Sequence, residues 1–494
     1  MSGLRDRPVI VGVGEAIDRP ASWLQLEPAE LMAQSVRAAE QDAGAALLGH
    51  IDHFTTVNEV SWPYDDAADS VSRLLGIAPA HRQNGPVGGQ TPTQFVHAAA
   101  LKIQAGEIAC AVVCGAEAEY SVRKARREGI TLNWSAPASA PPPQRAGDHQ
   151  RDVVRQLEAS APINVYPLYE NALRAAERLS FAETQNESAR LWSQLAGIAA
   201  AQENAWLTSP VSTVDILTPG PHNRPISWPY SKLMVANPMV NQGAAIIVMG
   251  EGLARRLGID PDRFVYILGG HAAAEPDDLL MRERFDRAKA MESVLERSSA
   301  ILGSRKPDFR ELYSCFPVVP KLARRFLGLE LEDPISVAGG LTFFGAPLNN
   351  YMSHAAAAMV RALRARGAGS GLLYAQGGYL TKHHTLVLSA DGPAEVLPEA
   401  DFVPVQSPTF AGDIIEDYAG PVAIETYTAL FESDQQLRHG IVLARTMEGA
   451  RTIARVDAHT PAIAELMDTT REVVGRLGEI SRVPGKSGQF AFTS

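Results

Sequence analysis

The hydrophobic pattern is clearest in residues 84–117, NGPVGGQTPTQFVHAAALKIQAGEIACAVVCGAEA. Glycines open this stretch, at Gly85, Gly88 and Gly89. A helical stripe of apolar residues follows until Gly106, and residues 108–114 then form a continuous apolar run, which is typical of a strand buried on both faces. The pattern therefore predicts a glycine turn, a helix and a central strand. The free N–H groups of the helix N-terminus would point at whatever lies above the turn.

The same order of elements occurs again from Ala338, in AGGLTFFGAPLNNYMSHAAAAMVRALRARGAGSGLLYAQGG. The two halves also open alike, with RPVIVGVGEA at Arg7 and RFVYILGGHA at Arg263, each a short apolar strand that runs into glycine. A repeat at about half the chain length indicates a duplicated domain rather than a solenoid. We predict two similar α/β halves packed back to back.

Other periodic segments complete the two halves. Strands are predicted at residues 8–13 and 244–249, and helices at residues 28–39, 65–75 and 277–302. Residues 135–143, SAPASAPPP, exclude both helix and central strand, and two amphipathic helices are predicted after them, around residues 166–178 and 188–206. The region of about 120–230 is therefore a helical loop insertion in the first half, and such insertions often cover a site.

The composition changes after residue 390. Runs such as VAIETYTALF and HGIVLARTMEGARTIARV predict strands, with one helix at 460–477 and a last strand at 488–492. We expect a small five-stranded β-barrel of the oligonucleotide-binding (OB) type there. The predicted domains are therefore residues 1–250, 251–390 and 391–494, as expected for a chain of 494 residues, which is too long for one hydrophobic core.

Composition and charge narrow the possible partners. Apolar residues make up 46% of the chain and charged residues 20%, as in soluble globular proteins, and the net charge of −11 argues against nucleic acid as a partner. No stretch predicts a signal peptide or a membrane span, and only Cys110, Cys114 and Cys315 are present, so we expect a cytoplasmic protein in a reducing compartment. Cys110 and Cys114, four residues apart on one strand, are interpreted as small buried side chains, and no metal site is predicted.

Four turns, in order, carry a family resemblance: NGPVGG, YSCF, GAP and AQGG. With two α/β halves and a helical insertion over residues 7–390, the chain resembles the thiolase superfamily, in particular its sterol-carrier-type and type 1 thiolase-like branches. Residues 391–494 resemble the additional domain of the type 1 thiolase-like proteins. The resemblance implies a five-layer αβαβα core with an acyltransferase fold, and acyl-CoA thioesters of lipid and fatty-acid metabolism as ligands.

The resemblance also locates the groups that thiolase chemistry requires, namely a cysteine nucleophile, a proton-shuttling cysteine and oxyanion holes. The nucleophile falls at Pro86, the histidine of the GHP turn at Ala346 and the second cysteine at Ala375. These three side chains have no nucleophilic or proton-transferring atom. Conventional thiolase activity is therefore not expected, which makes a pseudoenzyme one interpretation and leaves enzymatic activity open.

Tyr313, in the YSCF turn, is the candidate catalytic residue that remains. A phenol there could transfer a proton to or from a substrate hydroxyl, and the alternative is a core tyrosine at the end of a strand. Superfamily members that act as retro-aldolases on 3-hydroxyacyl-CoA have a tyrosine in this turn, a second tyrosine in the GHP turn, and a separate barrel-type partner. This chain has the first tyrosine but not the second, and Tyr351 is the nearest substitute.

Coenzyme A (CoA) carries phosphates, so its tunnel should have Lys or Arg at the mouth. The candidate CoA-contacting residues are Arg123, Lys124, Arg126, Arg127, Lys232, Gly345, Gly377 and Gly378, with Lys382 a further cation. A solvated charge run is the favoured interpretation of the basic residues at 123–127. His354, His383 and His384 could lie near the pocket, but structural histidines are the favoured interpretation. No permanently bound cofactor is predicted.

Three functions follow. The leading one is an acyl-CoA-binding, thiolase-like protein without the cysteine chemistry. The second is a retro-aldol lyase that acts on a 3-hydroxyacyl-CoA through Tyr313. The third is a non-catalytic scaffold that docks a protein partner through its C-terminal domain. The oligomeric state is predicted as monomer or homodimer, because that domain could hide the sheet edge through which thiolases pair.

Overall fold

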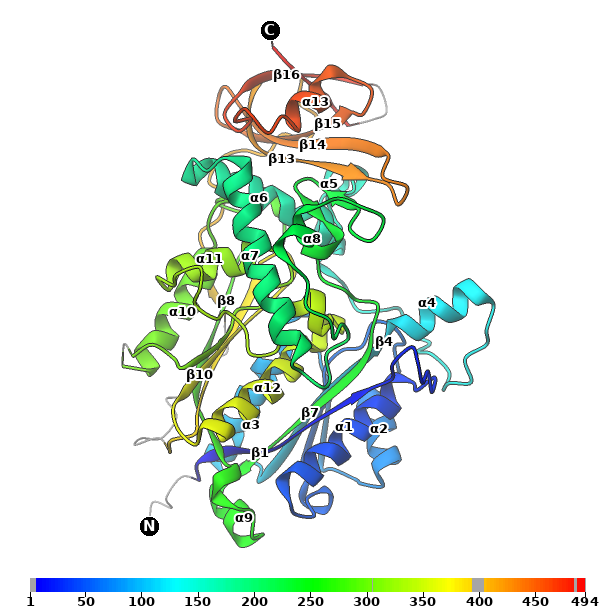
Figure 1. The fold of residues 1–494 in the computed structure, drawn as a ribbon, viewed down its shortest axis with the longest axis vertical. Coiled ribbons are helices and arrows are strands. Elements are labelled where there is room, and N and C mark those ends of the chain that lie inside the picture. Colours follow the sequence, from blue (N-terminus) through cyan, green and yellow to red (C-terminus); the bar gives the residue numbers. More distant parts are fainter. Residues whose placement is uncertain (1–5, 304, 393–403, 484–486, 494) are drawn as a thin grey trace.

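A computed structural model describes residues 6–303, 305–392, 404–483 and 487–493 (Figure 1). Its largest sheet has ten strands, in the order β3-β2-β4-β7-β1-β8-β11-β10-β9, with the short β12 (Val405–Gln406) paired to β8. Strands of the first half are β1 (Pro8–Ile17), β2 (His53–Thr56), β3 (His81–Asn84), β4 (Cys110–Ala118) and β7 (Asn241–Gly250). Strands of the second half are β8 (Val265–Ala274), β9 (Phe309–Glu311), β10 (Ser370–Gly377) and β11 (Lys382–Ser389).

The two halves repeat one topology. The order β1-β7-β4-β2 in the first half matches β8-β11-β10-β9 in the second, and the first two neighbouring pairs of each are antiparallel while the last is parallel. Among the described residues, the half-sheets pair with each other only where Val9 and Ile10 of β1 lie beside β8. The predicted duplication is therefore confirmed.

Helices and half-sheets form the five expected layers. The helices α3 (Thr91–Ala105) and α12 (Tyr351–Arg366) contact strands of both half-sheets and lie between them (Figure 1). Outside the first half-sheet pack α1 (Pro28–Ala43) and α2 (Ala67–Leu75); α9 (Glu251–Arg256) contacts β1 and β7. Outside the second lies α10 (Lys289–Ile301), and α11 (Val318–Phe326) packs against α10. Every residue of α12 from Tyr351 to Val360 is buried, because alanines let both sheets approach this helix closely.

The helical insertion consists of α4 (Glu119–Glu128), α5 (Asp152–Gln156), α6 (Pro162–Glu177), α7 (Phe181–Ala200) and α8 (Thr213–Leu217), followed by the short strands β5 (Pro225–Ser227) and β6 (Tyr230–Ser231). The helix predicted at 188–206 begins earlier, at Phe181, because Ser180 and Glu183 form a capping box. Short turns of helix are η1 (Leu48–His50), η2 (Ala146–His149), η3 (Lys232–Met234), η4 (Pro261–Arg263), η5 (Leu279–Met281), η6 (Gly340–Phe344) and η7 (Leu348–Asn350).

The helix predicted at 277–302 is wrong in its first half, because α10 begins only at Lys289. The buried Arg282 guanidinium donates to the carbonyls of Leu380, Arg284 and Arg287, and its Nη1 lies 2.6 Å from a Glu275 carboxylate oxygen. Because the carbonyls of Arg284 and Arg287 accept from this side chain, they do not accept the backbone N–H groups of a helix. The apolar residues before Lys289 are buried in an irregular segment instead of a helix.

The C-terminal domain is a closed five-stranded barrel, as predicted. Its strands are β13 (Gly420–Phe431), β14 (Leu437–Thr446), β15 (Arg451–Asp457), β16 (Leu477–Ser481) and β17 (Gln489–Phe492), and they close in the order β13-β14-β15-β17-β16-β13. The predicted helix at 460–477 shrinks to α13 (Pro461–Leu466), because Asp468 then caps a turn at Thr470. The OB type itself stays a prediction.

The barrel is tied to the helical insertion rather than to the edge of the large sheet. The barrel lies against α6 (Figure 1). Ser227 of β5 pairs with Leu430 of β13, and Arg174 of α6 forms a salt bridge with Glu472 of the barrel. The edge strand β3 remains exposed along its whole length. The expectation that the barrel could hide this edge is therefore wrong. No helix in the described part of the chain is long and apolar enough to cross a membrane.

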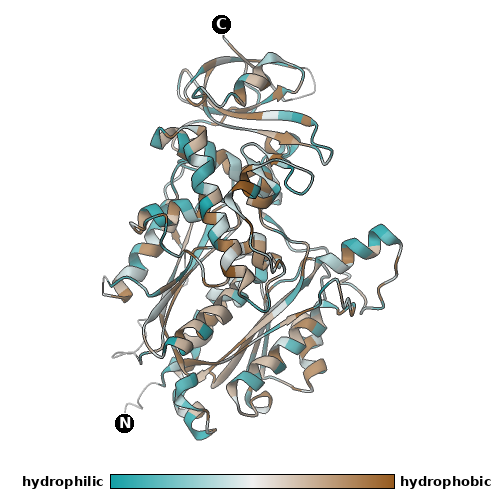
Figure 2. Cartoon of the chain, viewed as in Figure 1, coloured by the Kyte–Doolittle hydropathy of each residue, from teal (hydrophilic) through white to brown (hydrophobic). Residues whose placement is uncertain are grey.

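Hydrophobic residues are concentrated on the strands and on the helices that pack against them (Figure 2). Cys110 and Cys114 lie on β4 in the apolar core between that strand and α1, and both are buried. Burial raises the pKa of the Cys110 thiol to about 12, so it stays protonated. Among the described residues no group of His, Cys, Asp or Glu is arranged to hold a metal ion.

Candidate functional site

The glycine turns of the two halves meet at the N-termini of α3 and α12. A Cβ atom on Gly89 would lie 2.1 Å from the Tyr313 hydroxyl oxygen and 2.5 Å from the carbonyl oxygen of Gln376, so only glycine fits there. The third turn joins them because the Gly88 N–H donates to Asn349 Oδ1 at 3.0 Å. Segments that are far apart in sequence thus form one site in the middle of the molecule.

The three positions that the resemblance assigns to lost thiolase groups differ in their surroundings. Pro86 is exposed at the rim of the first turn. Ala346 is 3% exposed and its N–H donates to the Asn237 carbonyl at 2.9 Å. Ala375 is fully buried within β10, opposite His384 of β11. Gly345, next to Ala346, has a φ of +118°, and a Cβ there would lie 2.3 Å from Gln242 Oε1, which explains the glycine.

Tyr313 projects from the second turn into this site. Its backbone has a φ of +46°, a left-handed conformation that costs a non-glycine residue free energy and that often marks a functional turn. The residue is 5% exposed, and its ring stands edge-on to that of Tyr351, with centroids 5.8 Å apart. Burial and the neighbouring Cys315 raise the pKa of its phenol, which is therefore protonated at neutral pH and can donate a hydrogen bond.

The Tyr313 hydroxyl makes no hydrogen bond with any described residue, which sets it apart from other deeply buried tyrosines. The hydroxyls of Tyr166, Tyr169, Tyr230, Tyr351, Tyr374, Tyr379 and Tyr427 all have partners. Although the residue is 5% exposed, its hydroxyl oxygen keeps some solvent-accessible surface, so it can meet water or a ligand. A ligand that enters the site can therefore accept a hydrogen bond from Tyr313.

Tyr351 does not take the place of a second active-site tyrosine. Its hydroxyl donates to Glu311 Oε1 at 2.9 Å and accepts from the Gly340 N–H at 3.1 Å. Glu311 is completely buried and also accepts from the Ser336 hydroxyl at 2.6 Å. The substitute role suggested by the sequence is therefore wrong, because this hydroxyl is already engaged behind Tyr313.

A polar chain beside Tyr313 was missed by sequence reasoning. Tyr166 of α6 donates to Gln376 Oε1 at 2.9 Å, and Gln376 Nε2 donates to Cys315 Sγ at 3.1 Å. Burial raises the pKa of the Cys315 thiol to about 12, so this cysteine is a poor nucleophile. Cys315 and Gln376 lie within the YSCF and AQGG motifs, which is the signal that could have identified them. Tyr166 comes from the insertion and had no such signal.

The three candidate histidines are buried and hydrogen-bonded. His354 Nδ1 lies 2.6 Å from Glu15 Oε1, and His383 Nδ1 lies 2.8 Å from the Tyr374 hydroxyl. His384 contacts the Thr93 hydroxyl at 3.1 Å through Nδ1. Burial lowers the pKa of His383 to about 3, so it is neutral. These contacts match the structural interpretation of the three histidines.

The predicted CoA-binding cations occupy two places. On the projecting helix α4 (Figure 1), Arg123 pairs with Glu119, while Lys124 and Arg127 pair with Glu128. Lys124 also lies over the Trp23 ring, 4.7 Å from its centroid. Arg126 and Lys232 are exposed and have no ion pair with any described residue. Gly377 contacts the first turn, where its Cβ would lie 3.0 Å from the Gly89 nitrogen, and Gly378 has a φ of +66°.

Two buried carboxyl groups, those of Glu59 and Glu117, lie behind the first and third turns. Asn349 Nδ2 donates at 3.0 Å to the carbonyl of Asn58, the residue before Glu59. Burial raises the pKa of Glu59 to about 7 and that of Glu117 to about 8. Glu117 accepts backbone N–H bonds from Val60 and Ser61, both at 2.8 Å, which offset only part of the cost of burying its charge.

Replacing Glu117 with glutamine is expected to flatten the fall of stability with pH. A carboxyl whose pKa is higher in the folded than in the unfolded protein stabilises the fold at low pH, and that stability is lost as pH rises from about 4.5 through about 8. A difference of one pH unit between the folded and unfolded pKa values corresponds to about 1.4 kcal/mol. Thermal melts of Glu117→Gln and parent between pH 5.5 and 8.5 measure this. The exposed Glu107→Gln is the control, and parallel curves for Glu117→Gln and parent would contradict the expectation.

The fold has well-matched relatives among solved structures. A monomeric SCP2-thiolase like protein type 1 from Mycobacterium smegmatis is 26% identical, with a TM-score of 0.84 over 100% of both chains. The Ltp2-ChsH2(DUF35) aldolase is 19% identical and has a TM-score of 0.61 over 79% of this chain and all of that one. Human mitochondrial 3-ketoacyl-CoA thiolase is 14% identical, with a TM-score of 0.59 over 79% of this chain and all of that one.

No protein-family model matches the sequence, and no curated protein matches it. The structural match to the first of these relatives spans the whole chain, whereas the thiolase and the aldolase match 79% of it. Together with the duplicated halves and the closed barrel, these likenesses show that the chain has the thiolase-superfamily fold, in its SCP2-thiolase-like form.

Proposed function

We propose that this protein binds acyl-CoA thioesters of lipid or fatty-acid metabolism and does not carry out conventional thiolysis. The unpartnered hydroxyl of the buried Tyr313, held where the turns meet, is the observation that carries the proposal. A protonated phenol at this point can donate a hydrogen bond to a thioester carbonyl. Pro86, Ala346 and Ala375 supply neither a nucleophile nor an acid, so binding does not lead to acyl transfer.

The phosphates of CoA would lie toward the exposed rim near Pro86. Arg126 and Lys232, which have no ion pair with a described residue, are the cations best able to meet them, with Arg123, Lys124 and Arg127 releasing their glutamates on binding. Gly345, Gly377 and Gly378 would allow the pantetheine arm to pass close to the backbone. We further propose a cytoplasmic protein without a permanently bound cofactor, monomeric like its solved relative.

Replacing Tyr313 with phenylalanine is expected to weaken acyl-CoA binding about three- to tenfold, which is the value of one hydrogen bond. Binding of free CoA should change little, because free CoA has no thioester carbonyl. Isothermal titration calorimetry of both ligands against parent and variant separates these effects. The half-exposed Tyr120→Phe is the matched control. A parent protein that binds no acyl-CoA, or an equal loss for both ligands, would overturn the proposal.

A retro-aldol lyase acting on a 3-hydroxyacyl-CoA is the second candidate, favoured by Tyr313 itself and by the fold shared with a solved aldolase. The phenol would have to act as a base, and its raised pKa makes phenolate rare at neutral pH. Cleavage should therefore speed up with pH without reaching a plateau below pH 10. The third candidate, a scaffold whose barrel docks a protein partner, has no comparable support, because the barrel face toward α6 is already occupied.

A further inference from the structure

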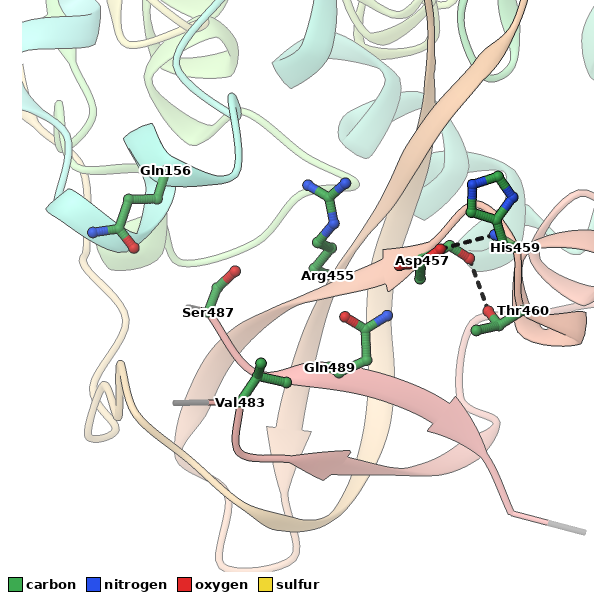
Figure 3. A pocket seen from close by; sticks show the side chains of 8 residues that line it. All are labelled: Gln156, Arg455, Asp457, His459, Thr460, Val483, Ser487 and Gln489. Atoms are coloured by element: carbon green, nitrogen blue, oxygen red, sulfur yellow. Dashed lines mark hydrogen bonds between the residues drawn. The ribbon is translucent and has the colours of Figure 1, made fainter. Parts of the chain in front are cut away.

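An open hollow lies between the barrel and the helical insertion, far in sequence from the turns of the candidate site. Its volume is about 820 Å³. Lining side chains among the described residues are Gln156, Arg455, Asp457, His459, Thr460, Val483, Ser487 and Gln489 (Figure 3). They come from α5, from β15 and the turn after it, and from β17, with Val483 after β16 and Ser487 near the start of β17. Every lining residue except Val483 carries a polar group, although the stems of these side chains contribute much apolar surface.

The register of the barrel places two hydrogen-bond donors side by side on one wall of this hollow. β15 and β17 are parallel, and Arg455 pairs with Gln489, with the Arg455 N–H donating to the Gly488 carbonyl at 2.9 Å. Neighbouring residues in this register share a face of the sheet. Ala454 and Val456 on the opposite face fill the barrel core, so Arg455 points outward, toward α5.

The guanidinium of Arg455 has no partner within the described residues. Other half-buried or buried arginines around the barrel are paired: Arg438 with Glu158 and Glu432, Arg445 and Arg451 with Glu425, and Arg174 with Glu472. Figure 3 shows the Arg455 side chain standing free between β15 and α5. A half-buried guanidinium without an ion pair presents several N–H donors that can bind an anion such as phosphate.

Gln489 supplies a second unmet donor beside Arg455. Its amide nitrogen Nε2 is buried and has no hydrogen-bond partner in the described part of the chain. The Thr460 hydroxyl and the exposed His459 ring lie at the far end of the hollow. The one carboxylate in the lining, that of Asp457, accepts from the backbone N–H of His459 at 2.9 Å, which stabilises that turn. The Thr460 hydroxyl is already engaged, because it donates to the Asp457 carbonyl at 2.8 Å, so Arg455 and Gln489 remain as donors for a ligand.

We propose that this hollow binds the phosphate group of a small phosphorylated molecule, with Arg455 and Gln489 as its main ligands. A phosphate offers three strong acceptor oxygens, enough for the guanidinium fork and the amide together. A nucleic-acid strand is disfavoured, because it needs a row of cations and stacking aromatics, whereas this lining has one unpaired arginine and no aromatic ring except His459. This proposal does not depend on acyl-CoA binding at Tyr313.

Equilibrium dialysis of the full chain with radiolabelled inorganic phosphate, at constant ionic strength, tests the site. We expect saturable binding to one site that glycerol phosphate displaces and acetate does not. Arg455→Met should weaken binding at least about tenfold, since hydrogen bonds to a charged group are each worth about 1.5 to 3 kcal/mol. The control is Arg482→Met, which removes an exposed arginine of the same barrel that pairs with Asp417.

Further variants keep the result interpretable. Gln489→Leu, which removes the second donor without removing charge, should weaken phosphate binding severalfold, and thermal melts check that each variant is folded. Tyr313→Phe should leave phosphate binding unchanged, which separates this site from the acyl-CoA site. Absence of saturable binding, or equal affinity of the Arg455→Met variant and the parent, would overturn the proposal. So would displacement by single-stranded oligonucleotides that strengthens with their length.

Discussion

Replacing Lys321 with methionine is expected to lower the free energy of unfolding by about 3 to 5 kcal/mol. Lys321 lies on α11 with its side chain 1% exposed, and its ammonium is 2.6 Å from Glu170 Oε1 of α6. It also donates to the Thr184 carbonyl of α7 at 3.0 Å. Methionine fills a similar volume but leaves the Glu170 carboxylate buried without its cation, which is the costly step. Urea denaturation followed by circular dichroism measures the loss.

Two further variants identify the origin of this effect. Arg190→Met breaks the exposed pair between Arg190 and Glu332 and should cost no more than about 1 kcal/mol. The double variant Lys321→Met, Glu170→Gln should be more stable than Lys321→Met alone, because the unpaired charge is gone while the amide oxygen still accepts from the Tyr230 hydroxyl. If Lys321→Met lowers the free energy of unfolding no more than Arg190→Met does, the buried pair between Lys321 and Glu170 does not stabilise the contact of α11 with α6.

Incubation with acetoacetyl-CoA and free CoA is expected to give no thiolytic turnover. Loss of a covalent nucleophile lowers turnover by about 10⁶-fold in a well-studied serine enzyme, and the positions assigned to both cysteines hold Pro86 and Ala375. Cys315 is the thiol near Tyr313, and its pKa of about 12 keeps it protonated. Loss of the thioester enolate absorbance, followed against an active thiolase added to a parallel sample, measures the reaction.

Ligand binding must be measured on the same preparation, so that inactivity is not mistaken for a lack of binding. Calorimetry with acetoacetyl-CoA serves this purpose. Sustained turnover by the parent protein would contradict the expectation. The Cys315→Ala variant would then show whether this thiol had taken over the role of nucleophile, because turnover through it should disappear with the sulfur.

The duplicated core was predictable because its signals are local and repeated. Continuous apolar runs predicted the central strands, and glycine predicted the ends of the two central helices, at Gly106 and Gly367, where left-handed C-caps are observed. The insertion and the barrel followed from changes in composition and from strand alternation. Errors arose where tertiary contacts override periodicity, as around Arg282, whose buried guanidinium binds the carbonyls of Arg284 and Arg287, which a helix would have used.

By itself the sequence determined the class of fold and the order of the turns, because both depend on residue identity and spacing, and the family resemblance added the prediction that the catalytic thiols of thiolases are lost. Only the tertiary structure decided which polar groups are satisfied. Tyr351 and Tyr313 look alike in sequence, yet Glu311 engages the first hydroxyl and no described residue engages the second. Arg455 likewise looks like any barrel arginine until its neighbours are known. Hydrogen bonding and burial depend on contacts between distant segments, and residue spacing does not encode those contacts.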